Sequence, residues 1–121
     1  MKKVYSMNKN FIVRDRDKIK PIPCPCGSSI RLITEKDTSI ANVHVTHIIE
    51  SRKHYHKKCT EIYYIIEGEG KMELSEREIV DLKPGVVVMI KPGIPHRGYG
   101  DFKALIVGIP ALQEEDEYFV S

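Results

Sequence analysis

Residues 54–70 read HYHKKCTEIYYIIEGEG and combine two histidines, a glutamate and an apolar run. His54 and His56 are two positions apart, so on a strand their side chains point to the same face, about 6.5–7 Å apart along the backbone. Glu61 follows after a turn, where the apolar run begins. Two imidazoles and a carboxylate placed in this way can converge on one metal ion.

A fourth candidate ligand, His96, ends the stretch KPGIPH at residues 91–96. The proline-glycine turn fixes the backbone just before this histidine. Three imidazole nitrogens and one carboxylate oxygen suit a divalent Mn, Fe, Co, Ni, Cu or Zn ion. The sequence does not distinguish among these metals.

The chain from Ser28 onward consists of short runs rich in Val, Ile and Tyr, separated by turn residues. This pattern predicts an all-β sandwich or barrel. The expected strands are Ile30–Thr34, Ile40–Ile49, Glu61–Ile66, Lys71–Ser75, Glu78–Leu82, Val86–Ile90 and Lys103–Ile109. The expected turns are Gly68-Glu69-Gly70, Pro84-Gly85 and Pro92-Gly93, and the only helix candidate is Gln113–Tyr118.

Residues 1–27 are expected to form an N-terminal arm, basic at first and rich in proline toward its end. Because proline cannot donate to a sheet ladder, Pro21–Pro25 is not a central strand. Phe11–Val13 is a candidate for one short strand before it.

Two motifs in this sequence resemble those of the cupin family. The first runs His54-x-His56, four residues, Glu61, six residues, Gly68; the second runs Gly85, five residues, Lys91-Pro92-Gly93, two residues, His96. The resemblance covers about residues 28–119. Three positions depart from the usual pattern and affect loops rather than ligands: Ile48, Lys91 and Gly100.

The resemblance implies a double-stranded β-helix, or jelly-roll barrel, over residues 28–121. It also implies that this barrel holds one divalent metal through His54, His56, Glu61 and His96. On an octahedral ion, four such ligands leave two positions for water or substrate, and open positions distinguish a reactive site from a structural one.

Two functions remain open for such a site. Cupins of similar size include dioxygenases, isomerases and decarboxylases, in which the metal stabilises negative charge on a small polar substrate. The alternative is a metal-dependent module that binds or senses a small molecule without chemistry, because one fold can host both. No general base stands out beside the ligands in the sequence.

Two residues are candidates for the substrate pocket. Tyr63 shares strand parity with Glu61, so it can donate a hydrogen bond to a metal-bound ligand or serve as an ordinary core tyrosine. Arg31 can clamp a carboxylate or form a surface salt bridge. His44 and His47 lie on opposite faces of one strand, so at most one faces the site, and neither is expected to be a ligand.

The three cysteines do not suggest a disulfide framework. Cys24 and Cys26 are separated only by Pro25, which is too close in sequence for an easy unstrained bridge, so we expect free thiols in a bend. The alternative is that one of them lines the mouth of the barrel. Cys59 is expected as an exposed thiol beside two lysines, and less readily as a soft metal ligand.

The bulk composition excludes several classes of partner. The 121 residues indicate one domain, and a formal net charge of +2 argues against a dedicated nucleic-acid binder. No apolar run is long enough to span a bilayer. The N-terminus lacks the apolar segment of a signal peptide, which predicts a cytoplasmic protein.

Several expected strands are apolar on both faces, including residues 62–66, 86–90 and 104–107. A lone barrel would present one polar face to water. We therefore expect a homodimer in which a second copy covers the outer face, with the arm as a candidate extra strand on the partner's sheet. The alternative is that the arm folds over its own sheet.

Overall fold

The computed structural model describes residues 10–120, and nearly all regular structure in it is β. The strands are β1 (Ile22–Cys24), β2 (Gly27–Ile33), β3 (Asn42–Glu50), β4 (His54–Tyr55), β5 (Thr60–Leu74), β6 (Glu78–Leu82), β7 (Val87–Ile90), β8 (His96–Ile109) and β9 (Tyr118–Phe119). Two short 3-10 helices are present, η1 (Arg16–Lys18) and η2 (Glu114–Asp116). No helix among residues 10–120 is long and apolar enough to cross a membrane.

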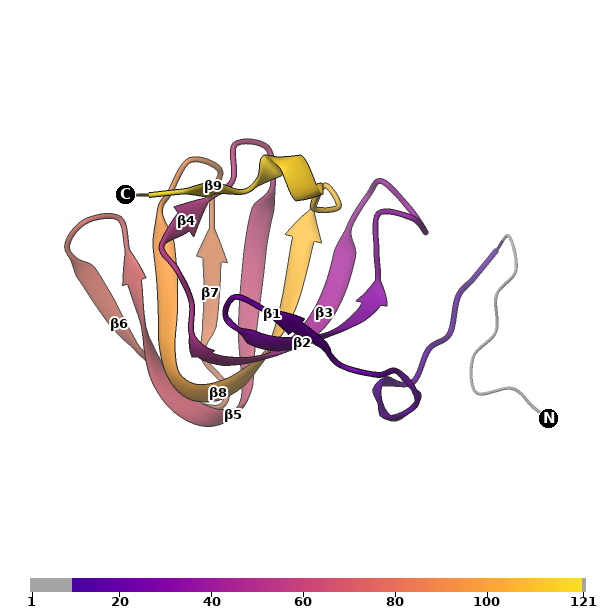
Figure 1. Cartoon of the computed structure of the whole chain (residues 1–121), viewed down its shortest axis with the longest axis horizontal. Helices are drawn as coiled ribbons and strands as arrows, with labels where there is room; N and C mark the ends of the chain where they lie inside the picture. The colour runs from indigo at the N-terminus through magenta and orange to yellow at the C-terminus, as the bar shows by residue number, and fades with distance from the viewer. Residues whose placement is uncertain (1–9, 121) are drawn as a thin grey trace.

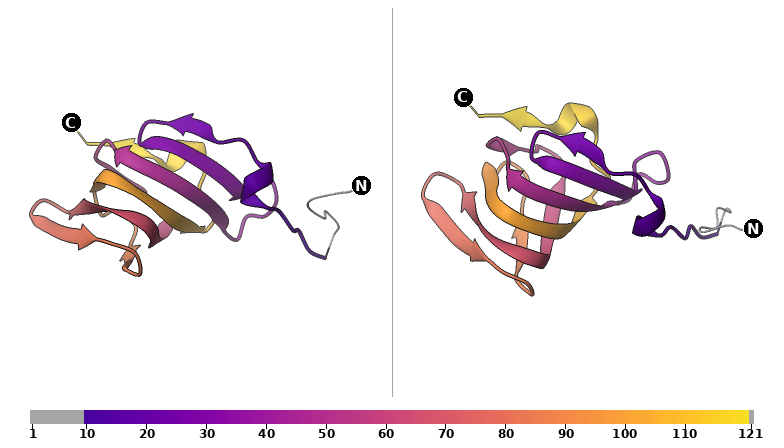
Figure 2. Two further views of the ribbon diagram at one scale, coloured as in Figure 1. Left: turned by 90° about the horizontal axis from the view of Figure 1, so that it is seen from below. Right: turned by 60° about the horizontal axis from the view of Figure 1, so that its bottom comes forward.

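Two long strands, β5 and β8, organise the fold. They pair antiparallel along their length, from Thr60 opposite Ile109 to Leu74 opposite His96. The first half of β5 also pairs with β7 and the second half with β6, while β8 pairs with β3 and β4. Because both long strands bend, the nine-stranded sheet curls around an interior (Figures 1 and 2). The predicted all-β, jelly-roll class is confirmed, although hydrogen bonding joins the two halves into one sheet.

The expected turn at Gly68-Glu69-Gly70 is wrong, because these residues lie inside β5. A register shift between Ile65 and Glu67 bends the strand there without reversing it. Gly68 has φ 85°, and a Cβ on it would collide with the carbonyl oxygen of Asp101 on β8. The glycine therefore permits close strand contact at a bend, whereas the turns at Pro84-Gly85 and Pro92-Gly93 form as expected.

The C-terminal segment is not the expected helix over Gln113–Tyr118. Only η2 is helical, and β9 then pairs with β4, with Tyr118 opposite Tyr55. In Figure 1 this segment runs across the end of the barrel where β4 lies. Packing against β4 overrides the helical tendency of the acidic run.

The described part of the arm, residues 10–27, ends in the hairpin formed by β1 and β2. β1 lies at the edge of the sheet, which suits its one proline, Pro23. The expected strand at Phe11–Val13 does not form, because Ile12 makes only an isolated β-bridge. Arg14 fixes this segment by binding Asp37 at 2.6 Å and the carbonyl of Leu32. Residues 1–9, also expected in the arm, lie outside the described part of the chain.

The expectation of free thiols at Cys24 and Cys26 is wrong, because the two residues form a disulfide. The hairpin pairs Cys24 with Gly27, and the turn brings the Cα atoms of the two cysteines to 5.3 Å. This separation lies within the normal range for a disulfide. The prediction failed because it treated the two-residue spacing as too short for an easy bridge, whereas the hairpin turn brings the two cysteines together.

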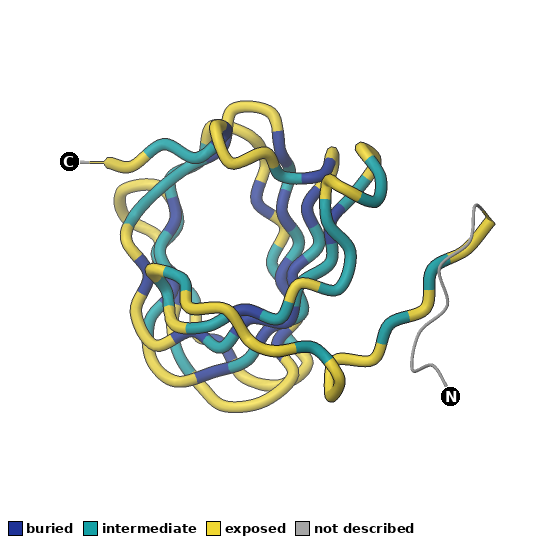
Figure 3. The backbone as a smooth tube through the Cα atoms, turned by 45° about the vertical axis from the view of Figure 1, so that its right-hand side comes forward, coloured by how far each residue is buried: buried dark blue, intermediate teal, exposed yellow. Residues whose placement is uncertain are grey.

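The apolar core fills one part of the interior and leaves another part open. Its most buried members are Ile48, Ile65, Met72, Phe102 and Ala104. In Figure 3 the backbone circles the interior, with buried residues distributed along the strands. The core packs against the same strands that carry the polar residues of the interior.

Candidate metal centre

The fold brings the four candidate ligands together from three strands and a loop. His54 lies on β4 directly opposite His96 at the start of β8, while Glu61 lies on β5 and His56 just after β4. One ligand atom from each residue lies within 4.8 Å of the others. Residues up to 42 positions apart thus form one cluster able to bind a metal ion.

Each histidine of the cluster is oriented by a backbone carbonyl. The Nδ1–H groups donate to Arg52 O at 2.7 Å from His54, to Asp116 O at 2.7 Å from His56, and to Ile94 O at 2.9 Å from His96. Because a carbonyl only accepts, Nδ1 of each ring carries a proton, and Nε2 is the nitrogen left to face the cluster and to bind a metal once its own proton is lost. This fixed ring orientation is typical of metal-ligating histidines.

Glu61 supplies the negative charge of the cluster. Its Oε1 lies 3.1 Å from Nε2 of both His56 and His96. Burial alone would raise the pKa of Glu61, but the hydrogen bonds from the two imidazoles hold it well below its usual range. The residue is therefore a carboxylate, and a buried carboxylate among imidazoles is a suitable cation ligand.

The pKa values of His56 and His54 shift in opposite directions. Burial would lower the pKa of His56, but its hydrogen bond to Glu61 outweighs this effect and raises the pKa to about 8. Burial, followed by the neighbouring His96, lowers the pKa of His54. A metal ion must therefore displace a proton from the His56–Glu61 pair but meets a neutral His54.

The residues present fit a divalent transition metal. The donor set is three nitrogens and one oxygen, and His56, Glu61 and His96 are buried. These residues would hold the ion through four donors, which would leave a six-coordinate metal able to bind a further ligand. When bound, the metal would act as a Lewis acid toward an oxygen of a small molecule.

Asp116 in η2 fixes the loop between His56 and Glu61. Its buried carboxylate accepts hydrogen bonds from the amides of Lys57, Lys58 and Cys59 at 2.9–3.3 Å. Burial would raise the pKa of Asp116, but these hydrogen bonds lower it. The sequence gives no signal for this role, since the contact joins segments that are more than 50 positions apart.

A cavity of about 720 Å³ opens beside the cluster and is lined by three of the four ligands. Tyr63 also lines it, buried and edge-on to the His96 ring at 6.3 Å. Burial, followed by the charge of Glu61, raises the pKa of Tyr63 well above its usual value, so the hydroxyl keeps its proton. This hydroxyl makes no hydrogen bond within residues 10–120, so it is available to a ligand.

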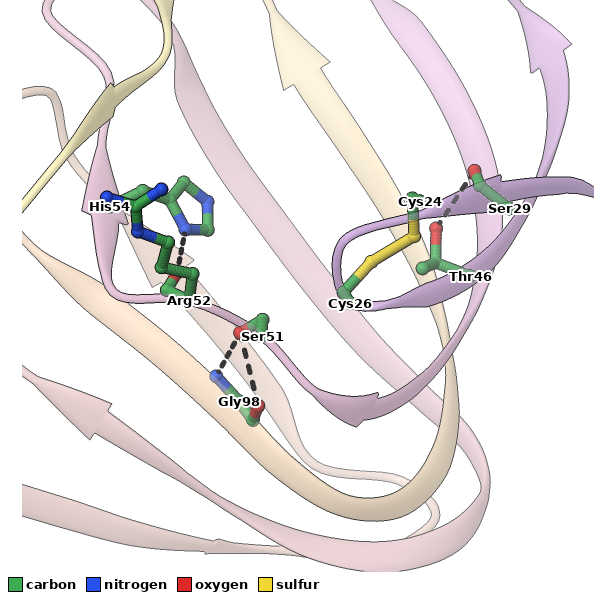
Figure 4. The surroundings of a disulfide bond; sticks show 8 residues. All are labelled: Cys24, Cys26, Ser29, Thr46, Ser51, Arg52, His54 and Gly98. Atoms are coloured by element: carbon green, nitrogen blue, oxygen red, sulfur yellow. Dashed lines mark hydrogen bonds between the residues drawn. A yellow bond between two sulfur atoms is a disulfide. The ribbon is translucent and has the colours of Figure 1, made fainter.

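The remaining sequence candidates divide between the two faces of the sheet. Arg31 lines the cavity, and so does His44, which the sequence did not assign to either face. His47 faces outward and pairs with Asp101 at 2.7 Å. Cys24 and Cys26 both line the cavity, and Figure 4 shows the disulfide that joins them.

Cys59 is neither the exposed thiol nor the soft metal ligand that the sequence suggested. The residue is 2% exposed rather than solvated, and its thiol donates to the carbonyl of Thr60 at 3.4 Å. Burial raises the pKa of the thiol to about 11. Its sulfur lies close to Gly108, and Cys59 is not part of the ligand cluster.

The comparisons with known proteins agree with this architecture. The model of the cupin domain family matches residues 44–106, so the chain belongs to the cupin family. An uncharacterised protein of Methanocaldococcus jannaschii is 33% identical over 116 residues, with 88% of this chain and 92% of the relative covered.

Solved structures extend the similarity to the whole barrel. A protein from Planctomyces limnophilus has 26% identity and a TM-score of 0.82, covering 88% of this chain and 95% of its own. Ectoine synthase from P. lautus has 24% identity and a TM-score of 0.75, covering 92% and 91%. At this identity, the ectoine synthase match supports the fold alone.

Proposed function

We propose that this cupin holds one divalent metal through His54, His56, Glu61 and His96 and acts on a small polar molecule in the adjoining cavity. The observation that carries the proposal is the set of three Nδ1–H bonds to backbone carbonyls, which leaves Nε2 of all three rings available to the ligand cluster. A structural role for the histidines would not require all three rings to be held in the same way.

Catalysis is the first form of this proposal. The cavity volume of about 720 Å³ is in the range of small-molecule sites, and the Tyr63 hydroxyl is a donor beside the ligands. Glu117 also lines the cavity, and its charge acts on His54, His56 and Tyr63. This carboxylate is a proton-transfer group that the sequence did not reveal. The reaction classes that fit are those of dioxygenases, isomerases and decarboxylases.

Binding or sensing without chemistry is the second form. It needs the same metal and cavity but no proton transfer. Incubation of metal-loaded protein with an extract of small polar metabolites, followed by mass spectrometry, separates the two forms. Conversion of a metabolite supports an enzyme, and retention without conversion supports a binding module. The His96→Ala variant is the control, and equal behaviour of this variant and the wild type would contradict both forms.

We further propose that the protein is a homodimer. Because Glu61 and Tyr63 face the interior, the alternate residues of β5 and its neighbours face outward, and Tyr64, Val87 and Met89 are 48%, 61% and 57% exposed. Residues 10–27 do not cover this face, which weighs against the arm as its own cover. A second copy of the same surface provides a matching apolar partner.

A further inference from the structure

Two basic side chains line the cavity on strands that carry none of the four ligands. Arg31 on β2 is the direct antiparallel partner of His44 on β3. The same inward row continues to Ile106 on β8 and to Tyr63 on β5. Directly opposed residues on one face have Cβ atoms about 4.5–5.5 Å apart, so the guanidinium and the imidazole can serve one bound group.

Neither side chain has a carboxylate partner among residues 10–120. Arg14 binds Asp37, and Arg97 binds Glu50 and Glu73, yet Arg31 forms no such ion pair. His44 likewise makes no hydrogen bond within the described chain. The guanidinium of Arg31 and an imidazole N–H of His44 therefore face the cavity, and neither donates a hydrogen bond to another residue of the described chain.

The charge around His44 favours an anion. Burial, and then the positive charge of Arg31, lowers the pKa of His44 to about 4, while Glu61 acts weakly in the other direction. Glu35 and Lys36, which have opposite charges, also line the cavity. The local field at the Arg31–His44 pair is thus positive, and the neutral imidazole still offers one N–H.

We propose that Arg31 and His44 form a carboxylate-binding subsite, so that the molecule bound at the metal is a small organic acid with a second oxygen-bearing end. This inference rests on the metal site proposed above and names its substrate class. The planar guanidinium binds a carboxylate through two parallel hydrogen bonds. A phosphate fits less well, because Glu114 and Glu117 also line the cavity and repel a single group that holds two negative charges more strongly than a carboxylate group that holds one.

The sheet geometry sets the length of this ligand. Three strand spacings of about 4.8 Å separate Arg31 from Tyr63 along the row. A molecule that reaches from the subsite to the metal must therefore be several bonds long. Dicarboxylates from malonate to adipate test this span.

The experiment is calorimetric titration of metal-loaded protein with these diacids and with valerate, which matches glutarate in carbon number but has one carboxylate. We expect a diacid of intermediate length to bind best and to bind more tightly than valerate. Arg31→Gln should weaken its binding roughly 10- to 100-fold, the effect of losing a charge-assisted bidentate contact, and should leave valerate unchanged. His44→Phe should also weaken binding of the diacid, but by a smaller factor than Arg31→Gln.

Lys36→Gln provides the matched control, since Lys36 lines the same cavity but is not in the row. It should change diacid binding less than threefold. Equal diacid affinity of the Arg31→Gln variant and the wild type, an equally large loss in Lys36→Gln, or no preference for diacids over valerate would each overturn the subsite.

Metal content distinguishes failure of the subsite from failure of the metal site. Arg31 is not a ligand, so the Arg31→Gln variant should retain the full metal content of the wild type. A wild type that takes up no metal would contradict the proposed function. In that case, Arg31-dependent binding of the diacid to metal-free protein would still support the subsite, and its absence would overturn it.

Discussion

The imidazole of His56 is held by the backbone of Asp116, whose carbonyl oxygen accepts the Nδ1–H bond at 2.7 Å. The side chain of the same aspartate caps the amides that follow His56. One C-terminal residue thus orients a ligand with its main chain and fixes the next loop with its carboxylate. The short strand β9 continues this segment and pairs with β4, which carries His54.

Replacing Asp116 with Ala should therefore weaken both metal binding and the fold. Loss of hydrogen bonds between buried amides and a carboxylate costs about 1.5–3 kcal/mol, which corresponds to a fall in Tm of about 5 °C or more. Metal affinity should fall roughly tenfold, as it does when groups behind metal ligands are removed. Differential scanning calorimetry and metal titration measure the two effects. Glu115→Ala, an exposed neighbour on η2, is the control and should change neither.

Metal affinity should depend on pH below about 8. The metal-free His56 is protonated below its raised pKa of about 8, and a metal ligand must be neutral. The dissociation constant should therefore rise about tenfold for each pH unit lowered between about 8 and 6. Calorimetry in two buffers of different ionisation enthalpy should detect about one proton released per metal at pH 7. A constant affinity over this range would contradict the assigned role of His56.

Removal of the metal should lower the thermal stability of the wild type. A ligand that binds only the folded state stabilises it by about 4 kcal/mol at a thousand times its Kd. We expect EDTA to reduce the Tm of the wild type by several degrees and to leave the His54→Ala variant unchanged. His47→Ala, which alters the outward-facing histidine, should respond like the wild type. Equal responses of all three proteins would count against the site.

The proposed dimer should dissociate when charge is placed on its outer face. Covering about 800 Å² per partner of mostly apolar surface offers enough free energy to offset association entropy. Val87→Glu introduces a charge at a position that is 61% exposed in the single chain. In analytical ultracentrifugation, the wild type should have a molar mass of twice 13.9 kDa, and this variant should have a molar mass of 13.9 kDa.

Ile79→Glu is the control for that experiment, because Ile79 is also exposed but lies on β6, away from β7. The control should remain dimeric. A wild type that sediments near 13.9 kDa at micromolar concentration would rule out the stable dimer.

Local pattern predicted much of the fold because strands and proline turns depend on near neighbours. Glu78–Leu82 and the Pro84-Gly85 turn form as expected. The pattern failed where distant pairing decides the structure. Gly68 bends β5 instead of ending it, because β8 pairs with the strand on both sides of the glycine.

The ligand cluster was accessible from sequence because its spacing is a motif, whereas the surrounding residues are not. His44 faces the cavity while His47 faces outward, and alternation alone cannot say which face is inside. Asp116 and Cys59 depend on one contact between a loop and the C-terminal segment. The Cys24–Cys26 disulfide depends on a hairpin turn that spacing does not reveal.

The most direct test of the metal site is elemental analysis of protein purified without chelator and then loaded with each candidate divalent metal. The account predicts about one metal ion per chain in the wild type and near zero in the His54→Ala and His96→Ala variants, with both variants still folded by circular dichroism. A wild type that takes up none of these metals, or variants that keep full occupancy, would contradict it.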